Sequence, residues 1–471
     1  MSKLPDIKTQ FPEWYQEVIY QAELAEQSPV RGCIVIRPYG TAIWESIKNI
    51  MDKKIKDTGH ENAIFPLLIP ESFFKKEAEH VEGFAPELAI VTHAGGKELA
   101  EPLVIRPTSE TMVHHMFAKW IKSWRDLPLK INQWANVMRW EMRPRAFLRT
   151  SEFFWQEGHT AHATQEEALE EALLMLEQYR DLAENYLAIP VFTGRKSEGE
   201  KFPGANKTYT FEAFMPDGKA LQMGTSHMLS QNFAKAFEMQ FQDKEGKLSY
   251  PWLTSWGSTT RLVGAVIMSH GDEKGLIIPP QIAPHQAVII PIYRNEEERE
   301  TVLKAAHTLK DSLKDKVRIH IDADDTKKPG NKFFHWEMRG VPLRIEIGPR
   351  DLTNNQCIIA NRLTGEKETI SLDVFAQELP KKLTAFQKQL FDAAKKRLDA
   401  MVDKKETLQD IIKHADNGGV SHTGFCEQSE CEKSLKQHTL SIRCLLDTKT
   451  VNLCFGCKNQ STTDCLIARS Y

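Results

Sequence analysis

The sequence lacks several features that would have decided its class at once. None of its apolar runs approaches the roughly 18 residues that a transmembrane helix needs, and its amino end has no apolar signal-peptide core. We therefore expect a cytoplasmic protein with no membrane partner. Lys and Arg number 61 against 64 Asp and Glu, which excludes a surface coated with positive charge. A hydrophobic fraction of 41% excludes wholesale disorder.

The two common glycine-rich phosphate-binding loops are also missing, so side chains would have to hold any nucleotide. Arg139 and Glu141, predicted to share one side of a strand, could offer a guanidinium to phosphate and a carboxylate to a base or a hydrated metal. Phe153, four residues beyond Arg149, could stack on a purine. The spacing alone leaves ordinary alternatives open, namely a cross-strand ion pair for Arg139 and Glu141, and a surface residue at a helix start for Arg261.

Cysteine is scarce except at the end of the chain, where six of the eight fall in the last 46 residues. Cys426 and Cys431 form one close pair, and Cys454 and Cys457 form another. Four thiolates at this spacing predict a closed, structural Zn²⁺ site. Disulfides are the main alternative, which a cytoplasmic location disfavours, and Cys444 or Cys465 could replace one of the four.

Charge is unevenly distributed. Residues 101–150 hold nine basic and four acidic groups, residues 151–200 hold three and eleven, and residues 301–350 hold eleven and seven. Two separate basic regions are what a protein that contacts polyanions at two places would have, although a solvated mixed surface is the simpler reading of any one block.

The apolar periodicity predicts three successive parts. Helices over 40–58 and after the capping box Thr164–Glu167, with a hairpin around Asp217–Gly218, indicate an antiparallel sheet with flanking helices over residues 1–280. Residues 278–284 are Pro-rich and predict a linker. Alternating strands and helices to about 380 then predict a small α/β domain, followed by a Lys-rich helix to about 413 and the cysteine-rich tail. We assign domains to 1–280, 281–385 and 386–471, an α+β chain overall.

Taken together, these motifs resemble those of class II aminoacyl-tRNA synthetases. The helix 40–58 and Pro66 resemble motif 1, Arg139, Glu141, Arg149 and Phe153 resemble motif 2, and Gly257 to Arg261 resemble motif 3. The runs Thr108-Ser-Glu110, Trp155-Gln-Glu-Gly-His159 and Gly224-Thr-Ser-His227 narrow the resemblance to prolyl-tRNA synthetases of the archaeal and eukaryotic type, with a C-terminal zinc-binding domain. Ser230 and Ser258 depart from the usual pattern without removing a candidate ligand.

The resemblance implies ATP-dependent attachment of L-proline to tRNA(Pro) through a prolyl-adenylate, with release of AMP and pyrophosphate. It also implies Mg²⁺ with ATP and a homodimer through motif 1. The implied proline-binding residues are Thr108, Glu110, Arg139 and His227, with Trp155 and Phe202 as apolar walls. The implied ATP-binding residues are Arg139, Glu141, Arg149, Thr150, Phe153, Gln222, Thr225, Thr259 and Arg261, of which Arg139 and Arg261 are catalytic.

Several alternatives stay open at this point. His227 could be an ordinary core histidine, and His114, His115, His159 and His162 are expected to be structural, because no acidic or Cys partner completes a metal site. Arg344, Glu346 and Arg350 are candidate anticodon readers, with a cross-strand ion pair as the alternative for Arg344 and Glu346. A threonyl-tRNA synthetase is one alternative, but this sequence has few ligands for the catalytic zinc that such an enzyme uses. A non-catalytic tRNA-binding relative is another, but it would be expected to lack the motif 2 and motif 3 arginines.

We predict measurable activation of alanine. Residues 158–221 already hold the predicted helix and hairpin, so they leave no room for an additional editing domain. A pocket for the proline ring excludes the smaller alanine by only ~1–3 kcal/mol. Pyrophosphate exchange with alanine measures this, and discrimination far beyond about 10³-fold in the activation step would contradict it.

Overall fold

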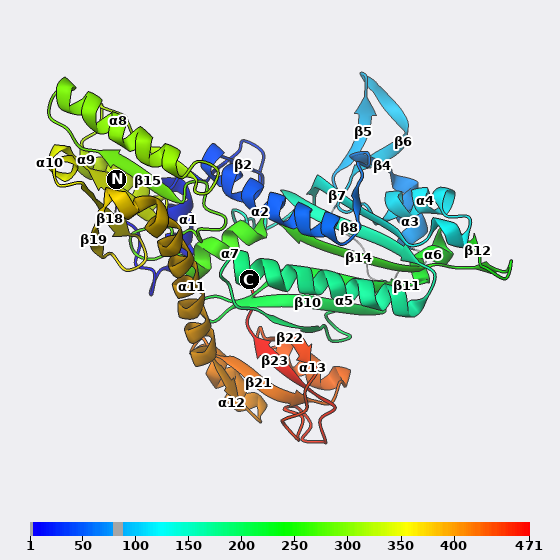
Figure 1. Cartoon of the computed structure of the whole chain (residues 1–471). Helices are drawn as coiled ribbons and strands as arrows, with labels where there is room; N and C mark the ends of the chain where they lie inside the picture. The colour runs from blue at the N-terminus through cyan, green and yellow to red at the C-terminus, as the bar shows by residue number, and fades with distance from the viewer. Residues whose placement is uncertain (1–2, 79–87) are drawn as a thin grey trace.

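The computed structural model describes residues 3–78 and 88–471. Figure 1 shows a large sheet with helices on it, a second sheet domain beside it, and a C-terminal part reached through one long helix. Within the described ranges, no helix has both the length and the apolar character that a membrane span requires.

An antiparallel sheet forms the centre of the molecule. Its neighbouring strands are β9 (Phe192–Arg195), β10 (Lys207–Phe214), β11 (Ala220–Ser230), β14 (Trp252–Thr259), β8 (Glu152–His162) and β7 (Leu129–Met138). Each of these pairings is antiparallel, and β3 (Glu61–Asn62) adds a short parallel strand beside β7. The predicted antiparallel sheet with flanking helices is thereby confirmed.

Helices pack on this sheet because each buries one apolar face. The predicted helices are present as α2 (Pro38–Asp57) and α5 (Gln165–Asp181). The predicted capping box is also present: Thr164 Oγ1 accepts from the backbone N–H of Glu167 at 3.2 Å, and the Glu167 carboxylate accepts from that of Thr164 at 3.3 Å. Helix α5 lies along β10 and β11 (Figure 1), while α7 (Arg261–His270) is buried from Leu262 to its end.

Shorter elements surround the central sheet. They are α1 (Phe11–Gln21), β1 (Ala25–Gln27), β2 (Ile34–Ile36), α3 (Glu71–Ala78), α4 (Glu110–Trp120), α6 (Asn232–Ala236), β12 (Phe241–Gln242) and β13 (Leu248–Ser249). A separate small sheet in the order β4 (Leu68–Pro70), β6 (Lys97–Ile105), β5 (Ile90–Ala94) projects from the body at the upper right of Figure 1.

The predicted hairpin is β10–β11, and its turn contains Gly218 at φ 78°. Apolar residues alternate along residues 208–215 in the sequence, a pattern typical of a strand with one buried face, but both faces of β10 are largely buried. Thr208, Thr210 and Glu212 are 0–2% exposed because their face lies against the pocket and the C-terminal part of the chain. The pairing shifts by one residue between Phe211 and Glu212, where a bulge interrupts the ladder.

The Pro-rich segment 278–284 has no regular structure but is not an exposed linker. Ile278 is 1% exposed, and Ile282 and Ala283 are fully buried in the same apolar cluster as Trp14 and Trp256. Composition indicated the break in secondary structure correctly, but it could not indicate that the break is packed into the core.

A five-stranded sheet follows in the order β16, β15, β17, β18, β19. Its elements are β15 (Ala287–Pro291), α8 (Glu296–Ser312), β16 (Ile319–Ile321), α9 (Pro329–Met338), β17 (Leu343–Ile347), α10 (Pro349–Thr353), β18 (Gln356–Asn361) and β19 (Lys367–Ser371). β15 pairs in parallel with β16 and β17, whereas β18 and β19 run antiparallel. The predicted strands are present, and α9 is an element that the periodicity did not reveal.

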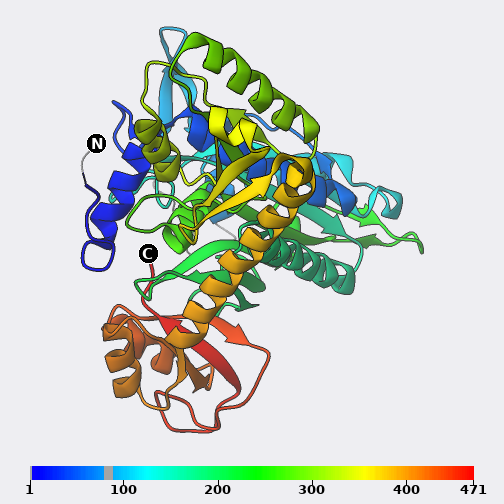
Figure 2. The same cartoon turned by 60° about the vertical axis from the view of Figure 1, so that its left-hand side comes forward.

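The Lys-rich helix ends earlier than predicted. Helix α11 (Phe375–Met401) gives way to β20 (Val402–Lys404), and a separate α12 (Leu408–Asp416) starts at its cap Thr407. The tail continues with β21 (Val420–Phe425), α13 (Ser429–Lys436), β22 (Ser441–Leu446) and β23 (Thr463–Ala468). Figure 2 shows α11 as the long connection to this part. Because β22 pairs with β9, the tail extends the central sheet.

Candidate active site

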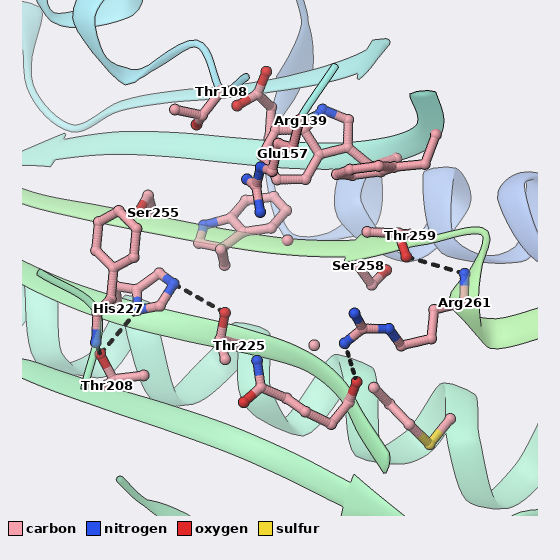
Figure 3. Close-up of a pocket in the computed structure, with 18 of the residues that line it drawn as sticks. Thr108, Arg139, Glu157, Thr208, Thr225, His227, Ser255, Ser258, Thr259 and Arg261 are labelled. Atoms are coloured by element: carbon pink, nitrogen blue, oxygen red, sulfur yellow. Dashed lines mark hydrogen bonds between the residues drawn. The ribbon is translucent and has the colours of Figure 1, made fainter. Parts of the chain in front are cut away.

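One pocket of about 450 Å³ opens on the central sheet (Figure 3). All the candidate proline- and ATP-binding residues line it: Thr108, Glu110, Arg139, Glu141, Arg149, Thr150, Phe153, Gln222, Thr225, His227, Thr259 and Arg261. They come from segments up to 153 residues apart, from Thr108 to Arg261, so the antiparallel pairing is what brings them together.

Arg139 does not lie on a strand, contrary to the prediction. Strand β7 ends at Met138, and Arg139 follows it with its Nε donating to the Pro107 carbonyl at 3.0 Å. Its guanidinium carbon is 5.4 Å from the ring centroid of Phe153 and 5.5 Å from that of Trp155. The aromatic wall fixes the guanidinium plane by cation–π contact and leaves its other nitrogens directed at the pocket.

Glu141 and Arg149 face each other beyond the strand end. The Arg149 Nε lies 3.5 Å from a Glu141 carboxylate oxygen, and the backbones of Arg145 and Arg149 exchange hydrogen bonds of 2.6 and 2.9 Å. This tight loop holds both side chains at the pocket mouth. The Arg149 side chain is 52% exposed, so it can turn toward an anionic ligand.

Arg261 is held more rigidly. Its Nη1 donates to the Gln222 carbonyl at 2.8 Å, its Nε donates to the Leu148 carbonyl at 3.1 Å, and Thr259 Oγ1 accepts from its backbone N–H at 3.0 Å. Burial, together with the charge of Arg149, lowers the pKa of Arg261 to about 10, so the guanidinium stays charged at neutral pH.

His227 is satisfied by two hydroxyls, as Figure 3 shows. Thr208 Oγ1 lies 3.0 Å from its Nδ1 and Thr225 Oγ1 lies 2.9 Å from its Nε2, while the Phe202 ring lies 4.6 Å away. Burial lowers the pKa of His227 to about 3, so the ring is neutral. It lines the pocket as a neutral hydrogen-bonding wall.

The sequence reading missed an acidic cluster at one end of the pocket. One carboxylate oxygen from each of Glu110 and Glu157 and one ring nitrogen of His159 all lie within 4.8 Å of one another. His159 was expected to be structural for want of an acidic partner, yet its Nε2 lies 3.2 Å from the Glu157 carboxylate. The signal was available, because residues two apart on a strand share a face. Glu110 comes from another segment, and Thr108 donates to its carboxylate.

The two carboxylates of this cluster have different environments. Burial raises the pKa of Glu110, and the negative charge of Glu157 adds to the effect. Burial alone would also raise the pKa of Glu157, but hydrogen bonds from His159, Ser109 and Gln133 hold it below its ordinary value. One carboxylate is thus kept ionised while the other readily takes a proton. Such a pair can receive a cationic ligand group.

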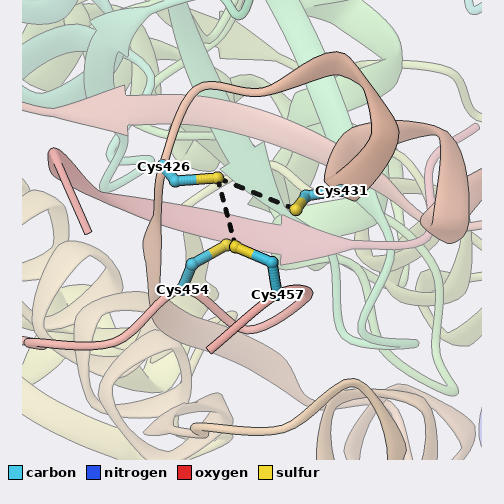
Figure 4. Close-up of side chains that lie close together, drawn as sticks. All are labelled: Cys426, Cys431, Cys454 and Cys457. Carbon is cyan, nitrogen blue, oxygen red and sulfur yellow. Dashed lines mark hydrogen bonds between the residues drawn. The ribbon is translucent and has the colours of Figure 1, made fainter. Parts of the chain in front are cut away.

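The four predicted zinc ligands meet at one point (Figure 4). The sulfur atoms of Cys426, Cys431, Cys454 and Cys457 lie within 4.8 Å of one another, and the Cys426 sulfur is 3.7 Å from those of both Cys431 and Cys457. Tetrahedral Zn–S bonds of about 2.3 Å put sulfur atoms about 3.8 Å apart, so the set fits zinc. A Cβ at position 456 would lie 3.0 Å from the Cys431 sulfur, so glycine keeps the knuckle open.

The alternatives for this set are not supported. Cys444 and Cys465 lie buried on β22 and β23 and are not members of the cluster. All eight cysteines of the chain, which lie in the described ranges, are free thiols.

Two of the three candidate anticodon residues, Arg344 and Glu346, contact each other along β17, whereas Arg350 is exposed. An Arg344 guanidinium nitrogen lies 3.0 Å from the Glu346 carboxylate, and Lys367 Nζ lies 2.8 Å from it. The Arg344 guanidinium also stacks 4.2 Å from the Phe333 ring centroid. Arg344 and Glu346 are thus paired along one strand, β17, and the ion pair to Glu346 from another strand comes from Lys367 of β19.

Comparison with known families matches three successive parts of the chain. Residues 92–270 match the tRNA synthetase class II core domain, residues 286–382 the anticodon-binding domain, and residues 408–471 the prolyl-tRNA synthetase C-terminal domain. The fold is therefore that of a class II aminoacyl-tRNA synthetase with an anticodon-binding domain.

Individual relatives are similar over nearly the whole chain. A proline–tRNA ligase of Alkaliphilus oremlandii is 51% identical, covering 94% of this chain and 92% of its own. One of Borreliella burgdorferi is 48% identical, covering 98% of each. A prolyl-tRNA synthetase of Cryptosporidium parvum, solved with halofuginone and AMPPNP, has 40% identity, a TM-score of 0.94 and 99% coverage of both chains. The chain belongs to the prolyl-tRNA synthetase family.

We expect the purified chain to carry one zinc ion. Replacing Cys431 by Ser should abolish it and lower the melting temperature, because a closed Cys₄ site contributes folding free energy. Elemental analysis of dialysed protein measures the metal, with Cys444→Ala and Cys465→Ala as controls that keep it. Loss of zinc in either control would contradict this choice of ligands.

Proposed function

We propose that this chain attaches L-proline to tRNA(Pro) in two steps, forming prolyl-adenylate and pyrophosphate from proline and ATP and then releasing AMP as the prolyl group passes to tRNA. The identity of 48–51% to proline–tRNA ligases over nearly the whole chain supports the overall reaction. The observation that carries the mechanism is that one pocket has buried carboxylates at one end and the guanidinium groups of Arg149 and Arg261 at the other, with Arg139 between them.

The acidic end suits the secondary ammonium of proline. Glu110, Glu157 and Thr108 together offer acceptors for its two N–H groups, and a bound cation would favour the ionised form of Glu110. The neutral His227, with Phe202 beside it, and Trp155 supply a compact and largely apolar surface for the ring. We assign proline binding to Thr108, Glu110, Arg139 and His227, and add Glu157.

Arg139 would couple the two reactants. Held against Phe153 and Trp155, its guanidinium can hold the proline carboxylate and the α-phosphate at once. Alignment of the attacking oxygen and stabilisation of the charge that develops on the α-phosphate are most of what this step needs from the protein.

The remaining groups would bind ATP. Arg149 and Arg261 take the outer phosphates, Phe153 stacks under the base, and Thr150, Gln222, Thr225 and Thr259 supply neutral hydrogen bonds. Glu141 faces the adenine or the Mg²⁺ that accompanies ATP, and an Mg²⁺ there would neutralise phosphate charge. The complex of the Cryptosporidium parvum relative with AMPPNP, an ATP analogue, supports a nucleotide site on this fold.

The other parts of the chain would serve tRNA binding and stability. We divide it into a catalytic domain (1–280), an anticodon-binding domain (281–385) and a C-terminal zinc-binding domain (386–471), the arrangement of the archaeal and eukaryotic type. The matched family ranges support this division, although the Alkaliphilus and Borreliella relatives are bacterial. We place the enzyme in the cytoplasm, where tRNA is charged.

Replacing Arg139 by Ala should lower proline-dependent pyrophosphate exchange by at least about 10²-fold, chiefly in kcat, because its contacts are strongest in the transition state. Circular dichroism should show an unchanged fold. Arg143→Ala is the matched control, since Arg143 is exposed in the same loop and does not line the pocket.

Near-normal exchange in Arg139→Ala would refute the role of Arg139. The same assay with other amino acids distinguishes the alternatives. Exchange that depends on threonine would indicate a threonyl enzyme, and no exchange with any amino acid would indicate a non-catalytic tRNA-binding protein.

We also propose a homodimer through the segment after α2. Ile64 is 94% exposed, and Leu67, Leu68 and Trp120 are 38–43% exposed close to it. The Phe65 and Trp120 ring centroids lie 6.2 Å apart, which links the segment to the end of α4. An exposed apolar patch of this kind is typical of a protein interface.

Ile64→Asp should convert the dimer to a monomer, because burying an unpaired carboxylate in the interface costs more than the contact contributes. Sedimentation velocity measures the result. Leu248→Asp is the control, since Leu248 is 62% exposed on the β12–β13 hairpin. A wild-type chain that is monomeric at micromolar concentration, or a dimer unaffected by Ile64→Asp, would contradict this interface.

A further inference from the structure

A buried ion cluster joins the C-terminal domain to the catalytic sheet. Its centre is Glu212 of β10, which is fully buried. Lys196 Nζ and Thr210 Oγ1 each donate to its Oε1 at 2.8 Å, and Arg443 donates to its Oε2 from Nη2 at 2.9 Å and from Nε at 3.2 Å. Lys196 and Arg443 are 3% and 6% exposed, so all three charges are withdrawn from water.

The cluster carries more positive than negative charge. Burial would raise the pKa of Glu212, but Lys196 and Arg443 hold it below its ordinary value. Loss of either cation still leaves one balanced ion pair, whereas loss of Glu212 would leave two buried cations uncompensated. Stability alone therefore needs only one of the two cations, which raises the question of what the second one does.

The position of the cluster answers this question. Glu212 sits at the bulge of β10, directly opposite Gln222 on β11. The Gln222 carbonyl accepts the Nη1 hydrogen bond of Arg261 at 2.8 Å. Arg443, on β22 of the C-terminal domain, is therefore connected to the pocket arginine by one ion pair, one strand pairing and one hydrogen bond.

The end of the chain contacts the same hairpin. The Tyr471 backbone N–H donates to the Ala220 carbonyl at 3.2 Å, and that of Ala220 donates to the Arg469 carbonyl at 2.8 Å. Ala220 begins β11, two residues before Gln222. The C-terminal domain thus holds the β10–β11 hairpin both at the bulge and at the start of its return strand.

We infer that Arg443 is a positioning residue: through Glu212 it fixes the β10–β11 register at Gln222, and so it sets the guanidinium of Arg261 for adenylate formation. The inference rests on the proposed function of Arg261. It gives the C-terminal domain an indirect part in catalysis, exerted through the position of Arg261.

The test is Arg443→Met in the full-length chain. Proline-dependent pyrophosphate exchange should lose about 10-fold in kcat, while the KM for proline changes less than about 2-fold, because the acidic end of the pocket is not touched. Arg443→Lys, which keeps one donor, should recover part of the loss. If Arg443→Met does not fold, Arg443→Lys decides the question, with a smaller loss in kcat and an unchanged KM for proline as the expected result.

Arg195→Met is the matched control. Arg195 lies next to Lys196 on the chain and forms the other arginine–carboxylate pair across this interface, 2.7 Å from Glu427, but it is 29% exposed and does not touch Glu212. It should retain kcat. An equal loss in this control would mean that domain docking in general matters, and would overturn the specific role of Arg443.

A double variant tests the route. If Arg443 acts through Arg261, Arg443→Met should cost little further activity on an Arg261→Lys background. The same fold-loss of activity on both backgrounds would overturn the inference. A normal kcat in Arg443→Met would also overturn it, as would a normal kcat in Arg443→Lys if Arg443→Met does not fold. Absence of proline-dependent exchange in the wild type would instead refute the proposed function itself.

Discussion

The register between β8 and β14 is the constraint on which the pocket depends. Gly158 pairs with Trp256, and a Cβ at 158 would lie 2.1 Å from the Trp256 ring, so only glycine lets the two strands approach. With this pair fixed, Glu157 and His159 face the same way, because they flank Gly158 on one strand. A slip of one residue would turn both away from Glu110 and dismantle the acidic end of the pocket.

Local signals in the sequence were sufficient for elements that depend on local physics. The capping box at Thr164 and the turn at Gly218 are such cases, and the cysteine pairs predicted the ligand cluster because each knuckle is a short-range structure. The family resemblance identified the pocket residues, whereas sequence spacing alone could not predict that Thr108 and Arg261 line the same pocket. The partnership of Glu110 with Glu157 was missed because it arises only when α4 and β8 meet.

Charge placement explains why the total of −3 conveyed so little. The acidic block 151–200 is not simply a solvated surface. Glu157 is buried in the pocket, and Glu171 is 3% exposed between His60 at 3.0 Å and Lys130 at 2.5 Å. Part of this negative charge is therefore paired with positively charged or hydrogen-bonding side chains inside the protein. The pocket keeps a separate polarity, with carboxylates at one end and Arg149 and Arg261 at the other.

The end of α11 at Met401 allows the part of the chain that holds the four-cysteine cluster to join the sheet that carries the pocket. Because the helix stops at Met401, the chain continues as β20, which pairs in parallel with β21, and the strands β21, β23 and β22 then continue into β9. The cysteine knuckles follow β21 and precede β23, so a metal there would stiffen these two strands, and β23 pairs with β22, which carries Arg443. Under the role inferred for Arg443, a metal bound there would influence adenylate formation only through the sheet, because the sheet continues from one domain into the next and transmits the position of a strand.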